Sequence, residues 1–250
     1  MTKIIAHRGY ALLYPENTKV AFDAAYHEHS QGFELDVHLT KDGEVVICHD
    51  DKIDRTSNGS GFIKDYTVEE LKSFDFAAKF PVNDLYRHTH AEQIMTLREY
   101  FEWLDGKNIE TNIELKTNVF QYEGIEKKIN SLIQEFGQQE SVIVSSFNHK
   151  SILRMKQENP SLLCGFLTMY GMLEPGEYCR KYGVEYYHPY HLTIDEDTIL
   201  DCQKNGVQIN AWTPNDAESI KKILDLQVSR IITDEPKLAL QLKKEMLLTE

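Results

Sequence analysis

The chain has 250 residues, of which 41% are hydrophobic and 27% are charged, and its formal net charge is −13 at pH 7. This composition is ordinary for a globular protein and excludes disordered and collagen-like chains, which have few apolar residues or a strict glycine repeat. An acidic surface repels polyanions, so we expect neither nucleic acid nor an anionic membrane surface as a broad partner.

Short β-like runs alternate with helix-like stretches along most of the chain, which favours βα units around a parallel sheet. The length suits one large α/β domain. Eight of these runs have the length and the composition of strands. They cover residues 3–6, 33–37, 109–115, 141–145, 163–167, 185–187, 207–211 and 230–233.

Amphipathic stretches separate most of these strands. Eight βα units predict an α/β fold of the TIM (β/α)8 barrel type, whose active site lies at the C-terminal ends of the strands. We expect a single domain over residues 1–250, because no linker, internal repeat or low-complexity segment divides the chain. The helical stretches cover residues 18–29, 123–136, 150–158, 195–204, 216–226 and 236–247.

Residues 40–95 interrupt this alternation and predict a small insertion after the second strand. Residues 41–43 read as a turn into an apolar run, as in a hairpin. Thr67 followed by Glu70 fits a capping box, so a short helix is expected to begin there. Because the insertion follows the C-terminal end of a strand, we expect it to form one wall of the substrate pocket.

The cysteines lie far apart without a Cys-x-x-Cys pair, so we expect buried, reduced thiols. The sequence begins without a long apolar leader, and no apolar run approaches the roughly 18 residues that cross a bilayer. We therefore predict a cytoplasmic protein without stable membrane insertion, and the sequence leaves a homo-oligomer open. The cysteines are Cys48, Cys164, Cys179 and Cys202.

Glu34 and Asp36 lie two positions apart in the second predicted strand, so their side chains point to the same face. Neighbouring carboxylates repel each other, and a divalent cation relieves this repulsion. Oxygen ligands favour magnesium, calcium or manganese over zinc. For an isolated pair, a salt bridge to a basic neighbour is the better explanation. Glu114, near the end of the third strand, adds a third carboxylate at the same end and favours the metal site.

Arg8 and Lys116 supply positive charge at this end of the predicted barrel. The planar guanidinium of Arg8 can bind two phosphate oxygens, and Lys116 shares the orientation of Glu114, two residues earlier. Each residue also has a simpler explanation, namely a salt bridge from Arg8 to a carboxylate and a Glu114–Lys116 pair within one strand. Both explanations stay open from the residues alone.

His7 and His49 each end an apolar run and are the candidate proton carriers, because histidine titrates closest to neutral pH. Asp50, next to His49, either orients the imidazole or caps the turn. A lone histidine at such a position is more often structural. Two of them near three carboxylates and two cations favour a catalytic role.

Three further motifs contain residues that bind ligands in other proteins. His88 and His90 form a His-x-His in a polar part of the insertion with no evident carboxylate partner, so a solvated loop is expected. His188 and His191 follow the sixth strand, where lining of the pocket and aromatic packing are both open. Trp212 follows the seventh strand and supplies either an apolar wall for a substrate or part of the core.

Taken together, the motifs resemble the glycerophosphodiester phosphodiesterase family. They occur in the family's order and approximate spacing, span nearly the whole chain, and are far more specific together than singly. Pro214 departs from the family pattern and bears on the shape of the pocket. The matching motifs are His7-Arg8-Gly9, Pro15-Glu16-Asn17-Thr18, Glu34-Leu35-Asp36-Val37, Thr40-Lys41-Asp42-Gly43, His49-Asp50, Arg55-Thr56, Glu114-Leu115-Lys116, Ser146-Phe147-Asn148 and Trp212-Thr213.

The resemblance implies roles for the acidic residues and the histidines. Glu34, Asp36 and Glu114 would bind one divalent cation, Mg²⁺ or Ca²⁺, with Mn²⁺ as a third option. His7 and His49 would act as general acid and base, in an order that the sequence leaves open.

The resemblance also implies the reaction. The family cleaves small glycerophosphodiesters, such as glycerophosphocholine or glycerophosphoethanolamine, to sn-glycerol 3-phosphate and an alcohol. Arg8 and Lys116 would hold the phosphate, and Trp212 would line the substrate site. The nucleophile is either water or the glycerol 2-hydroxyl. The alternatives are a related barrel phospholipase acting on lysolipids and an inactive relative that only binds a phosphodiester.

Overall fold

The structure, a computed structural model, describes residues 1–248. Its parallel strands form a closed barrel, because β1 (Lys3–His7) pairs with both β2 (Gly32–Leu39) and β9 (Arg230–Thr233). The predicted TIM barrel is therefore confirmed. The strands that complete the circle are β4 (Glu110–Leu115), β5 (Val142–Ser146), β6 (Leu163–Thr168), β7 (Tyr186–Pro189) and β8 (Gln208–Trp212).

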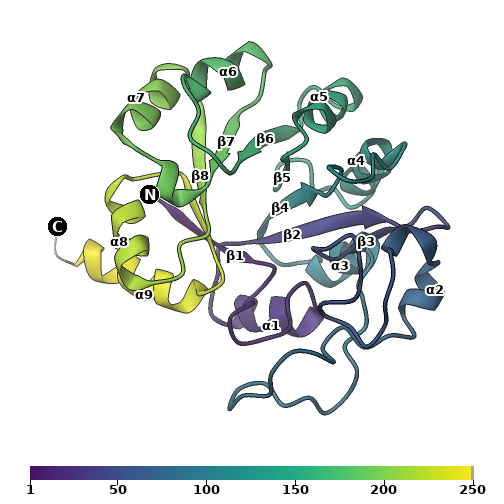
Figure 1. Cartoon of the computed structure of the whole chain (residues 1–250). Helices are drawn as coiled ribbons and strands as arrows, with labels where there is room; N and C mark the ends of the chain where they lie inside the picture. The colour runs from purple at the N-terminus through teal and green to yellow at the C-terminus, as the bar shows by residue number, and fades with distance from the viewer. Residues whose placement is uncertain (249–250) are drawn as a thin grey trace.

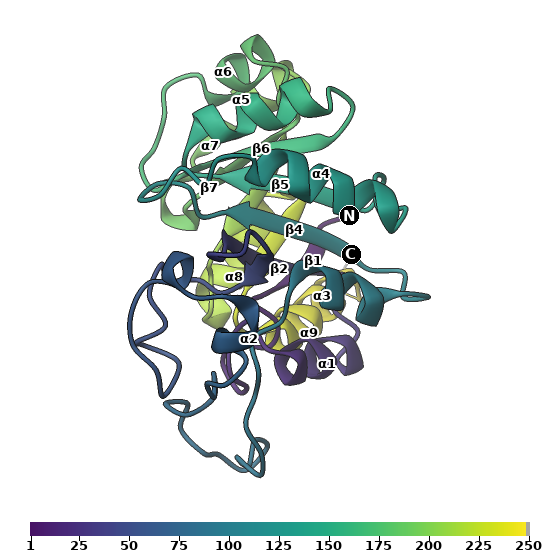
Figure 2. The same cartoon turned by 90° about the vertical axis from the view of Figure 1, so that its right-hand side faces the viewer.

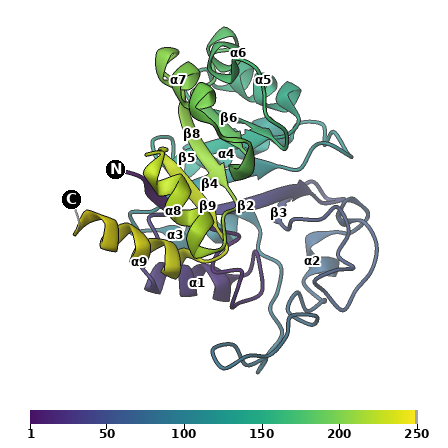
Figure 3. The same cartoon turned by 60° about the vertical axis from the view of Figure 1, so that its left-hand side comes forward.

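Helices surround the barrel (Figure 1), and α9 packs beside α8 and against β1 (Figure 3). For α3 (Leu97–Leu104) and α6 (Pro175–Lys181) the sequence predicted no helix. A capping box of Thr96 and Glu99 begins α3. The other barrel helices are α1 (Lys19–His27), α4 (Ile125–Glu135), α5 (His149–Glu158), α7 (Glu196–Lys204), α8 (Ala217–Asp225) and α9 (Pro236–Leu247).

The insertion between β2 and α3 forms a lobe at one side of the barrel (Figure 2). As predicted, it begins with a hairpin, in which β3 (Val45–Ile47) pairs antiparallel with β2. The predicted capping box of Thr67 and Glu70 begins α2 (Val68–Leu71). The lobe has a small core of its own, which consists of Val46, Cys48, Ile53, Ile63, Leu71, Phe76 and Ile94.

An aromatic cluster fixes two helices against β2, the strand that carries two of the predicted site residues. The ring of Phe22 on α1 lies 5.8 Å from Phe33 on β2 and 5.2 Å from Tyr100 on α3, between ring centroids. All three side chains are fully buried. Burying such a side chain contributes about 1.5–3 kcal/mol, so this cluster stabilises the part of the barrel that positions Glu34 and Asp36.

His188, on β7, lies buried inside the barrel. A Cβ atom on Gly165 of the neighbouring β6 would collide with the imidazole of His188, so glycine makes room for the ring. The amide nitrogen of Asn210 lies 3.0 Å from the same ring nitrogen. Burial, with a smaller effect of Arg230, lowers the pKa of His188 to about 3. The histidine is therefore neutral in the folded protein at every pH near neutrality.

From the buried, neutral His188 we predict that the protein loses stability as the pH falls. Below pH 6.5 the imidazole takes up a proton in the unfolded chain but not in the folded one, so the free energy of unfolding falls as the pH falls. Between pH 6.5 and about pH 5 the loss from His188 is about 2 kcal/mol. Urea unfolding at the two pH values measures this loss. In His188→Gln the fall in the free energy of unfolding is expected to be smaller than in wild type by that amount. The variant His27→Gln, which changes an exposed histidine, should keep the wild-type loss.

All four cysteines are buried and free, as predicted. Burial raises the pKa of the Cys48 thiol to about 12, so this thiol stays protonated near neutral pH. Across residues 1–248, no helix combines the length and the apolar character that crossing a membrane requires.

Candidate active site

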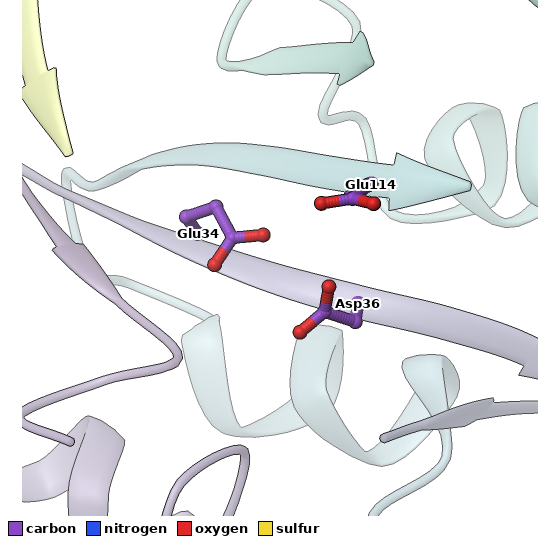
Figure 4. A group of neighbouring side chains, drawn as sticks. All are labelled: Glu34, Asp36 and Glu114. Atoms are coloured by element: carbon purple, nitrogen blue, oxygen red, sulfur yellow. The ribbon is translucent and has the colours of Figure 1, made fainter. Parts of the chain in front are cut away.

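The three predicted carboxylates converge at the C-terminal end of the barrel (Figure 4). Glu34 and Asp36 project from the same face of β2, and the strand register places Asp36 opposite Glu114 on β4. One carboxylate oxygen of each residue lies within 4.8 Å of the other two. Among the described residues, this is the one group of three or more histidine, cysteine or acidic side chains that converges so closely.

The electrostatics of this group fit a hard divalent cation. Burial and the charges of Asp36 and Glu114 raise the pKa of Glu34 well above its ordinary value. Burial also opposes ionisation of Asp36, but Lys116 and Arg8 outweigh it and lower the pKa of Asp36 below its usual range. Asp36 Oδ1 is buried without a hydrogen-bond partner. An ionised oxygen that accepts no hydrogen bond, together with two more carboxylates, makes a set of ligands that Mg²⁺ and Ca²⁺ prefer.

A tight turn after β1 positions Arg8. The residue has a φ of +55° and is followed by Gly9 with a φ of +80°. A Cβ atom on Gly9 would lie 2.6 Å from the backbone of Ala21 on α1, so only glycine fits here. The turn lets the Arg8 N–H donate to the Glu34 carbonyl at 2.9 Å and to the Glu34 carboxylate at 3.1 Å.

Both predicted phosphate-binding cations touch the acidic group. Arg8 Nη1 donates to Glu16 at 3.1 Å, and Arg8 Nε lies 3.3 Å from Asp36 but donates no hydrogen bond. Lys116 Nζ donates to Glu114 at 2.8 Å and lies 3.5 Å from Asp36 Oδ1. Burial disfavours both charges, but the carboxylates outweigh it and raise the pKa of Arg8 and of Lys116. The salt bridges weighed from the sequence are therefore present, and both side chains also line the cavity described below.

The imidazole of His7 is held by the far end of the chain. Its Nδ1 lies 2.7 Å from an oxygen of Asp234, in the segment after β9. Asn215 donates to the other Asp234 oxygen at 2.5 Å. The second ring nitrogen, Nε2, lies 3.8 Å from the Glu34 carboxylate. One nitrogen is thus fixed by Asp234, and the other is directed at the acidic group.

His49 has a matching arrangement. Its Nδ1 lies 2.7 Å from Asp50, which settles the sequence alternative in favour of orienting the imidazole. Arg55 donates to the other Asp50 oxygen at 2.7 Å and binds both oxygens of Glu16 at 2.7 Å. Glu16 also accepts a hydrogen bond from Arg8. One continuous chain of charged groups therefore links His49 to Arg8, the residue predicted to bind phosphate.

These side chains surround a cavity of about 180 Å³ at the mouth of the barrel. Both histidines, both cations, Glu34 and Glu114 line it, and Phe147, Leu167, Met169, Trp212 and Ile232 form its apolar side. The ring of Trp212 meets Phe147 edge-on at 5.5 Å, and its Nε1 donates to the His188 carbonyl at 2.9 Å. Trp212 therefore lies on the apolar side of this cavity. Because His49 belongs to the insertion, the insertion contributes to the lining of this cavity.

The His-x-His motif does not join this site and lies in an exposed loop, as expected, but it has carboxylate partners that were not evident from the sequence. Carboxylate partners are present, because His88 Nε2 lies 2.7 Å from Asp75 and His90 Nε2 lies 3.4 Å from Glu92. These partners were not predicted from the sequence, because they lie outside the motif on a loop without regular structure. His191 is buried and packs edge-on against Tyr190 at 4.9 Å, so aromatic packing explains it.

Sequence reasoning missed Asp234 and gave Glu16, Asn17 and Arg55 no role. Asp234 directly follows the last strand, so the same strand-end rule that found Glu114 points to it. Asn17 donates to Asp36 Oδ2 at 2.9 Å. It thereby helps to orient a carboxylate that the sequence did identify.

The fold is that of a TIM-barrel enzyme, and histidines, carboxylates and cations gather around one cavity at the mouth of the barrel. The model of the glycerophosphoryl diester phosphodiesterase family matches residues 7–238, and the chain belongs to this family. The resemblance inferred from the motifs is thereby confirmed.

Individual relatives agree with this assignment. A glycerophosphodiester phosphodiesterase of Caldanaerobacter subterraneus subsp. tengcongensis is 39% identical over 98% of both chains. A glycerophosphodiester phosphodiesterase structure from Thermotoga maritima is 28% identical, with a TM-score of 0.76 over 97% of this chain and 98% of that one. A phosphodiesterase of Oleispira antarctica in complex with the product sn-glycerol-3-phosphate is 25% identical, with a TM-score of 0.83 over 98% and 97% of the two chains.

Proposed function

We propose that this enzyme hydrolyses glycerophosphodiesters, such as glycerophosphocholine and glycerophosphoethanolamine, to sn-glycerol 3-phosphate and an alcohol. The observation that carries the proposal is that two histidines, two cations and a carboxylate group border one small cavity. The product complex of the Oleispira antarctica relative supports the same product here. Lysolipid hydrolysis has no comparable support. An inactive relative would lack some of these groups, and all of them are present.

Glu34, Asp36 and Glu114 would hold one divalent cation, Mg²⁺ or Ca²⁺, with Mn²⁺ as a third option. When bound, the cation would stabilise negative charge that builds on the phosphoryl oxygens. Arg8 and Lys116 would hold the same phosphate from the protein side. Both stay charged on burial, and both side chains line the cavity.

His7 and His49 would move the protons. Each has Nδ1 engaged by an aspartate, which leaves Nε2 for proton transfer. One histidine takes the proton of the attacking group, which is water or the glycerol 2-hydroxyl. Attack by the 2-hydroxyl forms a cyclic phosphate, which water then opens to sn-glycerol 3-phosphate. The other gives a proton to the departing alcohol oxygen as the P–O bond breaks.

We also propose a cytoplasmic location, because four buried free cysteines suit a reducing compartment.

Release of sn-glycerol 3-phosphate by the purified protein tests this function. Glycerophosphocholine and glycerophosphoethanolamine are supplied with Mg²⁺, Ca²⁺ or Mn²⁺, and again after chelation. We expect release that chelation abolishes and that one of the metals restores. A rise in the thermal midpoint on adding the same metal to chelated protein gives a second readout of binding. No release with any metal would contradict the proposal.

A further inference from the structure

A second cavity, of about 510 Å³, lies next to the first. The two share His49 and Lys116 in their walls, and the second is otherwise formed by the insertion and the segment after β4. A group bound between His49 and Lys116 can therefore extend into either cavity.

The linings of the two cavities suggest how a diester divides between them. The first cavity measures about 180 Å³ and the second about 510 Å³, and the two share lining residues. The apolar wall and the charged groups of the first cavity suit one half of the substrate together with the phosphate. The other half then has the second cavity available on the far side of His49.

Asp51 is the unmatched group in the second cavity. Its Oδ1 is buried and has no hydrogen-bond partner, while the side chain as a whole is 27% exposed. The nearest imidazole nitrogen, His38 Nδ1, lies 3.9 Å from that oxygen. Both ring nitrogens of His38 have other partners, the Tyr122 hydroxyl at 3.1 Å from Nδ1 and the His49 carbonyl at 3.2 Å from Nε2, so this imidazole does not satisfy the Asp51 oxygen. An acidic group so placed favours a positively charged ligand.

The cations around this cavity are already engaged. Lys116 is bound to Glu114 and approaches Asp36, as described above. Lys64 donates to Asp65 at 2.7 Å. Lys52 is exposed, and its ammonium lies 4.7 Å above the ring of Phe62, which takes that aromatic face away from a ligand. Water and salt screen an exposed ammonium such as Lys52 more than the partly buried Asp51.

We propose that the second cavity binds the alcohol half of the substrate and that Asp51 selects alcohols bearing an ammonium group. This inference rests on the proposed function and names the substrate class. Asp51 is a specificity-determining residue, with no part in proton transfer or metal binding. An ammonium group in this cavity gives the Asp51 carboxylate the positive partner that the protein does not supply.

The test compares glycerophosphoethanolamine, whose alcohol is cationic, with glycerophosphoglycerol, whose alcohol is neutral. In wild-type protein we expect the higher kcat/KM for the cationic substrate. In Asp51→Asn we expect the ratio of the two kcat/KM values to fall about ten-fold, with kcat/KM for glycerophosphoglycerol within about two-fold of wild type. Asp51→Glu keeps the charge and should retain most of the preference.

Glu69→Gln is the matched control, because it removes an exposed acidic charge from the same lobe at a residue that does not line the cavity. It should leave the ratio unchanged. Cleavage of both substrates by wild type with an unchanged ratio in Asp51→Asn would overturn this inference alone. A wild-type preference for the neutral substrate would do the same. If wild type cleaves neither substrate, the proposed function fails and the inference falls with it.

Discussion

Replacing His49 with alanine is expected to lower turnover of a glycerophosphodiester by about 10²–10⁴-fold, the usual contribution of a general acid or base. His7→Ala should have an effect of the same order. Each imidazole has Nδ1 held by an aspartate at 2.7 Å and lines the small cavity. Initial rates with saturating substrate and metal, together with the thermal midpoint, separate loss of chemistry from loss of folding.

Imidazole added to the solution gives a sharper readout for these variants. The His49 side chain is 30% exposed, so small molecules can reach the space that the alanine leaves. We expect imidazole to restore part of the turnover of His49→Ala and to leave His27→Ala, an exposed control, unaffected. Turnover of His49→Ala or His7→Ala within about ten-fold of wild type would remove that histidine from the mechanism.

The strands and most of the site were predictable because they depend on local rules. Alternation along a strand placed Glu34 and Asp36 on one face, and parallel strands ending at one edge placed Glu114 with them. The register of β2 and β4 confirms this, since Asp36 lies opposite Glu114. His7 is the last residue of its strand, so its place at the site could be predicted from the position of the strand end alone.

Partners that depend on closure of the barrel could not be predicted. Asp234 and His7 are 227 positions apart in the sequence, and they meet because β1 pairs with β9. Arg55 and Glu16 are 39 positions apart and meet through the fold of the insertion. Neither pair has a local pattern, so only the three-dimensional structure shows which aspartate orients His7.

The two missed helices have different causes. The capping box of Thr96 and Glu99 was readable, but it follows the irregular insertion and was passed over. The start of α6 depends on tertiary contacts, since a Cβ atom on Gly176 would lie 2.5 Å from the carbonyl oxygen of Asp201. The N–H of Gly176 donates to the Asp201 side chain at 2.6 Å. A helix fixed in this way leaves little signal in its own sequence.

Glu34→Gln is expected to lower turnover at least ~100-fold and yet to stabilise the chelated protein. The Glu34 carboxylate is 3% exposed, and an oxygen of it lies within 4.8 Å of oxygens of Asp36 and Glu114. Without a cation these groups repel one another. A glutamine oxygen can still accept from the Arg8 N–H, which now donates to Glu34 at 3.1 Å. We expect turnover to fall at least ~100-fold through loss of a metal ligand, as is usual when a metal site is weakened.

The expected stabilisation of chelated Glu34→Gln is about 1–2 kcal/mol, or roughly 2–8 °C in thermal midpoint for a chain of this size. Added metal should raise the midpoint of wild type but not of the variant. Glu110→Gln is the matched control, because Glu110 lies at the opposite end of β4 and binds Arg230 at 2.9 Å and Lys3. Losing that carboxylate should lower the midpoint and leave turnover intact. A chelated Glu34→Gln protein less stable than chelated wild type would show that the three carboxylates do not repel, and that neighbouring cations already balance their charge.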